Sequence, residues 1–313
     1  MWQNAAIQTE SDYMTLKAVK KPDSAIISYL LTAVAPLCWA GNIVLARGVT
    51  EIIPPISFAF WRWAVAFLIL LPFAMRQVVR DWPLFLKHWK IMLFLSLTGI
   101  SGFNTLLYTA MHTTTAINGS LIQTCMPAVI LIISIFAFKD HFEIIHYLGV
   151  TICIVGACMV IFKGSVHALL SLSLATGDIL MLIAVVLYAL YTAYMRKRPA
   201  AMHPLSFMVY SFAVGAMGLV PLYVWEIRNV GVFSLSTDVI MSILYVSLFP
   251  SIAAYFCWNR GIATIGANRT GLFVNLIPVF ASLMAVAFLG EAFRWYHLTG
   301  MAMIAGGMVM FNR

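Results

Sequence analysis

Long apolar stretches separated by short polar segments run through nearly the whole chain. Ten of them have about the 20 residues that an α-helix needs to cross the hydrocarbon core of a bilayer. They lie at 25–46, 54–75, 90–111, 115–137, 144–162, 174–195, 204–225, 238–261, 266–289 and 295–312. The pattern predicts an all-α integral membrane protein with ten transmembrane helices.

The composition excludes a soluble domain. Of the 313 residues, 62% are apolar and only 10% are charged, and the mean hydropathy is +0.94. Soluble domains are about 45–50% apolar and about 25% charged, so lipid must face much of this surface. Residues 1–24 are polar and predict a short cytoplasmic tail.

The basic residues predict the orientation. With the N-terminus in the cytoplasm, 14 of the 19 Lys and Arg residues fall in cytoplasmic segments and four fall outside, while Arg62 is left inside a span. Cytoplasmic loops of membrane proteins collect Lys and Arg, which accounts for the net charge of +8 without a nucleic-acid partner. We expect a multi-pass plasma (inner) membrane protein with both termini in the cytoplasm.

The second half of the chain repeats the first. At a shift of 149, Arg47 aligns with Arg196; at a shift of 151, Pro127 aligns with Pro278 and Asp140 with Glu291. The repeats cover 25–163 and 174–313 and contain five predicted spans each. An odd number of spans reverses the second repeat in the membrane, and inverted repeats are a transporter architecture.

The order and spacing of several short motifs resemble the drug/metabolite transporter superfamily, in its ten-helix EamA-type branch. The chain departs at Asp140, where that family more often has Glu, and at Tyr188, where Trp is common. The resemblance covers 25–312 and implies passage of small metabolites, often amino acids, through a central cavity. The motifs are Trp39-Ala40, Phe60-Trp61-Arg62, Leu107-Tyr108-x-Ala110, Pro127, Ala267, Pro278-Val279, Leu289-Gly290-Glu291, Gly300 and Gly306-Gly307.

Arg62 is the only formal charge well inside a predicted span. It lies eight residues after Pro54, so about 12 Å from the outer end of the helix at 1.5 Å per residue. Intramembrane charges usually face a bundle interior or an aqueous cavity, where Arg62 would hold a carboxylate. The alternative is a side chain that reaches back to the outer interface or to helix-end carbonyls.

Two prolines interrupt the fourth and ninth spans near their centres. Pro127 and Pro278 each remove a helical donor and release the carbonyl four residues earlier. An amide side chain lies nearby in each case, Gln123 before Pro127 and Asn275 before Pro278. Matched helix breaks predict a transporter site; a packing kink satisfied by neighbouring helices is the alternative.

Further amides and aromatic side chains complete the candidate substrate site. Asn42 and Asn104 lie within spans, where interhelical hydrogen bonding is the alternative role. Aromatic residues could form the walls of a cavity and accept an apolar side chain. These are Trp39, Tyr108, Tyr188, Tyr191 and Trp258.

We therefore expect a secondary transporter for an amino acid or similar zwitterion, with export favoured, working by alternating access. An exporter of a larger metabolite or drug-like cation, and a receptor or scaffold without flux, are the alternatives. No catalytic or metal-binding motif is present, so no enzyme and no cofactor are expected. All eleven acids lie in tails, loops or span ends, which favours flux driven by the substrate gradient or exchange over proton coupling. Glycine pairs in the fifth and tenth spans predict peripheral packing helices and a monomer, with a dimer contact as the alternative.

Overall fold

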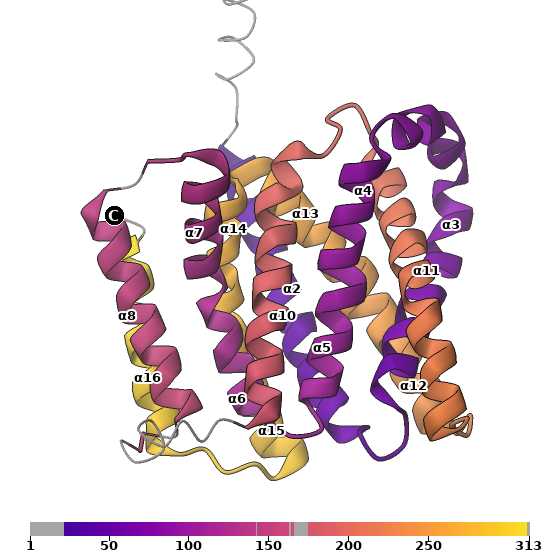
Figure 1. Ribbon diagram of the computed structural model, residues 1–313. Coiled ribbons are helices and arrows are strands. Elements are labelled where there is room, and N and C mark those ends of the chain that lie inside the picture. The colour runs from indigo at the N-terminus through magenta and orange to yellow at the C-terminus, as the bar shows by residue number, and fades with distance from the viewer. Residues whose placement is uncertain (1–21, 142, 163, 166–174, 312–313) are drawn as a thin grey trace, which may run out of the picture.

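The computed structural model describes residues 22–141, 143–162, 164–165 and 175–311, and every element in these ranges is a helix (Figure 1). The first half of the chain forms α2 (Pro22–Gly48), α3 (Pro55–Lys87), α4 (Trp89–Ser96), η1 (Leu97–Gly102), α5 (Phe103–Ala110), α6 (Ala116–Ile122), η2 (Gln123–Cys125), α7 (Met126–Phe138) and α8 (Ile144–Ile161).

The second half forms a corresponding series. It consists of α10 (Thr176–Tyr194), η3 (Met195–Lys197), α11 (Pro204–Val230), α12 (Thr237–Val246), η4 (Ser247–Ala253), α13 (Ala254–Ile265), α14 (Ala267–Leu272), η5 (Phe273–Asn275), α15 (Leu276–Leu289) and α16 (Trp295–Phe311).

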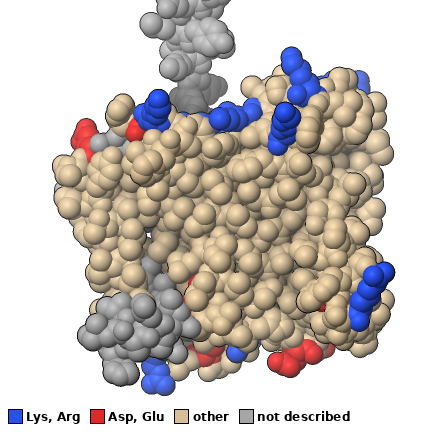
Figure 2. All heavy atoms as spheres, in the orientation of Figure 1, with Lys and Arg blue, Asp and Glu red and all other residues tan. Residues whose placement is uncertain are grey.

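Eight helical runs of the described residues are long and apolar enough to cross a membrane. The helices at the fifth and tenth predicted spans, α8 and α16, are shorter, with 18 and 17 residues. Figure 2 shows a broad, largely uncharged band across the visible face, with most of the visible Lys and Arg side chains along the upper edge. The chain is thus a multi-pass membrane protein, as its hydropathy predicted.

Two pairs of irregular turns interrupt the helices at matching places in the two halves. A π-helical turn joins α4 to α5 (η1) and another joins α12 to α13 (η4). A 3₁₀ turn at Gln123–Cys125 precedes α7, and one at Phe273–Asn275 precedes α15. Pro127 and Pro278 follow these 3₁₀ turns, as expected if the missing donor of each proline is what weakens the helix there.

Helices α3 and α11 lie side by side and cap one another (Figure 1). Each begins with a proline at its first position, where the missing N–H would be unpaired in any case. Glu226 of α11 accepts hydrogen bonds from the Ser57 N–H (2.6 Å) and Oγ (2.7 Å) at the start of α3. Asp81 of α3 accepts one from the His203 N–H (2.8 Å) at the start of α11. Both helices extend beyond their predicted ends, and the extensions carry these carboxylates.

Helices α8 and α16 pack against each other at one edge of the bundle (Figure 1). A Cβ on Gly156 would lie 2.9 Å from the Gly300 carbonyl oxygen, and one on Gly307 would lie 2.5 Å from that of Gly149. The glycines that were predicted to permit close packing therefore let α8 and α16, at the fifth and tenth predicted spans, pack closely within one chain.

Candidate functional site

Arg62 lies near the middle of the bundle, with 1% of its surface exposed. Its Nη1 donates to Asn104 Oδ1 (2.8 Å), Tyr108 OH (2.8 Å) and Asn42 Oδ1 (3.2 Å). Its Nε and Nη2 donate to Ser251 Oγ (2.6 Å) and the Pro250 carbonyl (3.2 Å). The Arg62 side chain is therefore directed into the bundle, where all of its hydrogen bonds are made with α2, α5 and η4.

Three other elements supply the oxygens around Arg62. Asn104 and Tyr108 are four residues apart in α5 and so share one face of that helix. Tyr108 also donates to Asn42 Oδ1 of α2 (2.8 Å). The π-helical turn η4 lets the Pro250 carbonyl accept from side chains, and it receives bonds from both Arg62 and Trp39 Nε1 (3.0 Å). Such π turns are frequent at functional sites.

Every oxygen bonded to Arg62 belongs to a neutral group. Within the described residues, the hydrogen bonds and ion pairs of Arg62 include no carboxylate. Buried Glu226, one turn from the end of α11, is already bonded to the start of α3. Arg62 is thus a buried cation whose dipolar neighbours satisfy its N–H groups but do not neutralise its charge.

A small cavity lies beside this cluster. Its walls include Trp39, Asn42, Gln123 and Tyr188, and its volume of about 10 Å³ is close to that of a single water-sized probe. The Nε2 of Gln123 has no hydrogen-bond acceptor although the side chain is buried. A buried amide donor beside an almost closed cavity provides a polar contact that a ligand could use.

Aromatic rings form the other wall of the site. The Trp39 ring centroid lies 4.8 Å from that of Trp258 and 5.7 Å from that of Tyr188, both in edge-on arrangements. Tyr188 is in turn 5.3 Å from Tyr191. This cluster connects the Arg62 site to the face of the bundle where α10 ends.

The structure does not bring all predicted site residues together. Arg62, Asn42, Asn104 and Tyr108 are bonded to one another, and Trp39, Gln123 and Tyr188 line the adjacent cavity. Asn275 and Pro278 instead line a separate pocket of about 250 Å³ against α16. The two halves therefore differ at the helix breaks, because only Gln123 of the two amides borders the central cavity.

Sequence reasoning missed Pro250, Ser251 and Tyr255. Ser251 and the Pro250 carbonyl bind Arg62 directly, and the Tyr255 ring lies 6.1 Å from Trp39. Only the proline in an apolar span was a usable signal. The role of a serine or a main-chain oxygen cannot be predicted from a sequence unless the local helix geometry is known.

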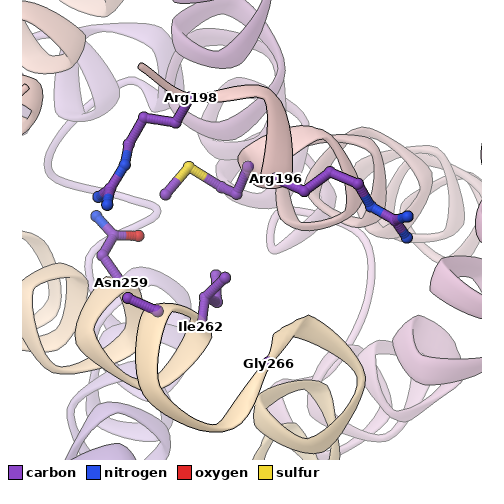
Figure 3. A pocket seen from close by; sticks show the side chains of 7 residues that line it. Arg196, Arg198, Asn259, Ile262 and Gly266 are labelled. Carbon is purple, nitrogen blue, oxygen red and sulfur yellow. The ribbon is translucent and has the colours of Figure 1, made fainter. Parts of the chain in front are cut away.

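A further pocket, of about 280 Å³, opens at the face where α10 ends and α13 meets α14 (Figure 3). Arg198 reaches across it toward Asn259, whereas Arg196 points away. Asn259 is 5% exposed; its Oδ1 accepts from Tyr191 OH (2.9 Å), and its Nδ2 has no acceptor. Burial lowers the pKa of Arg198, but an arginine remains charged.

The described residues contain no group of three or more His, Cys, Asp and Glu side chains that could hold a metal ion. Together, the fold and the site define a polytopic membrane protein whose helices enclose a buried arginine and its polar partners beside a small cavity.

Comparisons with known proteins identify the family. The EamA-like transporter family matches residues 26–162 and again 175–313. The uncharacterized transporter YyaM of Bacillus subtilis (strain 168) is 28% identical over 265 residues, 85% of this chain and 87% of that protein. The WAT1-related protein At3g02690, chloroplastic, of Arabidopsis thaliana is 23% identical over 278 residues, 88% of this chain and 66% of that protein.

A solved crystal structure matches with a TM-score of 0.64 at 15% identity, covering 90% of this chain and 95% of that one, which shows a common fold. The chain belongs to the EamA-like transporter family of the drug/metabolite transporter superfamily. It is a membrane transporter and not an enzyme.

Proposed function

We propose that this transporter moves a small carboxylate-bearing zwitterion, such as an amino acid, and that Arg62 binds its carboxylate. The observation that carries the proposal is the buried guanidinium of Arg62, which has five neutral oxygen contacts and no acidic partner among the described residues. A substrate carboxylate would supply the missing charge through two parallel N–H···O bonds, which are stronger than bonds to neutral oxygens.

The proposed architecture is a pair of inverted five-helix repeats, 25–163 and 174–313, with α8 and α16 as the fifth and tenth spans. Two observations support it. The π-helical and 3₁₀ turns recur at matching places in the halves. In Figure 1, α2 begins at the upper edge of the bundle and α10 at the lower edge. Repeats of opposite orientation can exchange conformations and so open a central site to alternate sides.

Differences between equivalent contacts support an opening toward the Lys- and Arg-rich face, although a pocket of about 790 Å³ beside Glu226 also lies at the opposite face. At the lower edge, Glu291 accepts hydrogen bonds from the first two N–H groups of α6 (2.9 and 3.1 Å), and Arg47 bonds the Met111 carbonyl (2.7 Å). Their repeat counterparts, Asp140 and Arg196, instead pair with each other (2.7 Å) beside the open pocket. We propose that, in the opposite state, Asp140 leaves Arg196 and caps the start of α14.

The Lys and Arg bias supports a cytoplasmic location for this open face. A site that binds substrate from the cytoplasm, with flux driven by the substrate gradient, would export the substrate across the plasma (inner) membrane. No acidic side chain lines the central cavity within the described residues, so the proposal includes no proton-carrying carboxylate there.

Counterflow in proteoliposomes tests this function. Vesicles loaded with a mixture of unlabelled amino acids should accumulate the corresponding labelled ones, tested one at a time, and Arg62→Met should abolish the accumulation. The exposed Arg260→Met variant is the control for loss of a charge and should transport normally. Counterflow by Arg62→Met at the wild-type rate would disprove the role of Arg62.

The same assay addresses the two alternatives. A larger drug-like cation would need an acid to bind it, and the residues lining the central cavity include none; accumulation of labelled organic cations but not of amino acids would favour it. A receptor or scaffold would bind its ligand without any flux.

A further inference from the structure

The two halves contain the same tyrosine–asparagine hydrogen bond with the residue types exchanged. Tyr108 OH donates to Asn42 Oδ1 in the first half (2.8 Å), and Tyr191 OH donates to Asn259 Oδ1 in the second (2.9 Å). Asn42 and Tyr191 are related by the shift of 149, and Tyr108 and Asn259 by the shift of 151. The second pair therefore occupies the position in its half that the Arg62-bound pair occupies in the first.

The second pair has no arginine at the position equivalent to Arg62. The shift of 149 places Ser211 there, a buried serine whose Oγ has no hydrogen-bond partner. A guanidinium instead approaches from the chain segment after α10, where Arg198 lines the 280 Å³ pocket together with Asn259. In Figure 3 the Arg198 side chain points toward the amide of Asn259.

Both polar groups at this point of the pocket are donors. Asn259 uses its oxygen for Tyr191, which fixes the amide so that Nδ2 remains the unpaired end. Arg198 has N–H groups only. Two donors cannot bond each other, and the residues lining the pocket include no acid. The chemistry that satisfies both is an anion placed between them, and a carboxylate can accept from both at once.

We propose that Arg198 and Asn259 form a second carboxylate site, which receives the substrate at the cytoplasmic face before it reaches Arg62. The sidedness rests on the proposed function, whereas carboxylate binding at Arg198 does not. The aromatic residues Tyr191, Tyr188 and Trp39 connect the two sites. The pocket beside Arg198 is large enough for a small organic acid, and the central cavity is almost closed in this conformation.

Equilibrium dialysis with radiolabelled benzoate, on the full chain purified in detergent, tests the site. The Arg62→Met background removes the central site, so that any remaining binding reports the Arg198 site. We expect benzoate to bind to this background protein and Arg198→Gln to weaken binding at least tenfold, about 1.4 kcal/mol. Benzamide, which has the same ring without the charge, should bind at least tenfold more weakly than benzoate.

Two further variants complete the design. Asn259→Asp keeps an acceptor for Tyr191 but places a carboxylate where the benzoate carboxylate would bind, so it should abolish benzoate binding. Lys197→Gln removes a neighbouring charge that does not line the pocket and should bind like its parent. Each variant must elute as a single species with the parental unfolding temperature.

Three results would overturn the proposal: no benzoate binding in the Arg62→Met background, unchanged binding in Arg198→Gln, or equal affinities for benzoate and benzamide. Failure of the proposed function is a different result. If Arg62→Met transports normally while Arg198→Gln loses benzoate binding, the proposed role of Arg62 is wrong and the carboxylate site at Arg198 is supported.

Discussion

Replacing Arg62 with methionine removes a buried charge and leaves a flexible apolar side chain of similar length. The variant separates two roles for Arg62. A structural arginine would be needed for folding, whereas a substrate-binding arginine without a counter-charge is held in the bundle at a cost in stability.

Arg62→Met makes two opposing contributions to the free energy of unfolding, and the structure allows them to be compared. Removing the charge relieves a desolvation penalty of several kcal/mol. Asn104 Oδ1 would lose its hydrogen bond, whereas Asn42 still accepts from Tyr108 and the Pro250 carbonyl still accepts from Trp39. The Ser251 and Tyr108 hydroxyls would each keep the bond that they donate. An unpaired buried acceptor costs about 1–3 kcal/mol, and the bonds lost with the guanidinium are the ones that offset its desolvation penalty in the wild-type protein.

These contributions largely cancel. We therefore expect the free energy of unfolding of Arg62→Met to lie within about 2 kcal/mol of the wild-type value, while counterflow is abolished. Denaturant titration of the purified protein, followed by tryptophan fluorescence, measures the first quantity, with the exposed Arg260→Met variant as the control. A loss of more than about 4 kcal/mol, comparable to breaking a buried charge pair, would mean that Arg62 supports the fold and that our reasoning is wrong.

Three predictions concern the helix ends and packing contacts. Glu226→Gln should destabilise the protein by about 1–3 kcal/mol, since the amide turns a donor toward the N–H groups that start α3; unchanged thermal unfolding would contradict this. Gly307→Ala, whose Cβ would meet a backbone oxygen at 2.5 Å, should cost about 1–3 kcal/mol, whereas Gly306→Ala, with nothing within 4 Å, should unfold like wild type; equal unfolding temperatures would contradict the packing of α8 on α16. The Arg196 guanidinium lowers the pKa of Asp140, so the stability from this pair is present above the unfolded carboxyl pKa and lost as pH falls through the lowered one. Because both side chains are about one-third exposed or more, Asp140→Asn should cost at most about 1 kcal/mol at neutral pH and nothing in acid; a difference that persists in acid would exclude the ion pair as its cause.

Hydropathy located the helices well because the bilayer sets the length of each apolar run. It located their ends less well. α3 continues from the predicted end at residue 75 to Lys87, since a helix that has left the hydrocarbon can continue with polar residues. Apolar content marks the part within the lipid, not the point where the helix stops.

The residues around Arg62 were predictable for a similar reason. Asn42, Asn104 and Tyr108 are polar groups in apolar spans, and such groups usually face the bundle interior. Asn275 fits the same description but lines a pocket near α16, because it lies one residue after Val274, which is the residue equivalent to Gln123 at the central cavity. The sequence also hides Ser251 and the Pro250 carbonyl, whose role depends on the π-helical turn.

The exchanged tyrosine–asparagine bond was missed because the repeat was detected through matching residue types. Tyr191 and Asn259 do not match Asn42 and Tyr108 in type, although each pair forms the same bond. Repeats can conserve an interaction while exchanging its partners, and only the structure reveals the correspondence.

The origin of the carboxylates that cap the helix ends bears on biosynthesis. The starts of α3 and α6 receive theirs from Glu226 and Glu291 in the second half, and the start of α11 receives one from Asp81 in the first. While the ribosome is still making the second half, α3 and α6 lack these partners and their first N–H groups must find water or lipid headgroups. The first half can therefore form the capping contacts of the final structure only after Glu226 and Glu291 have been synthesised.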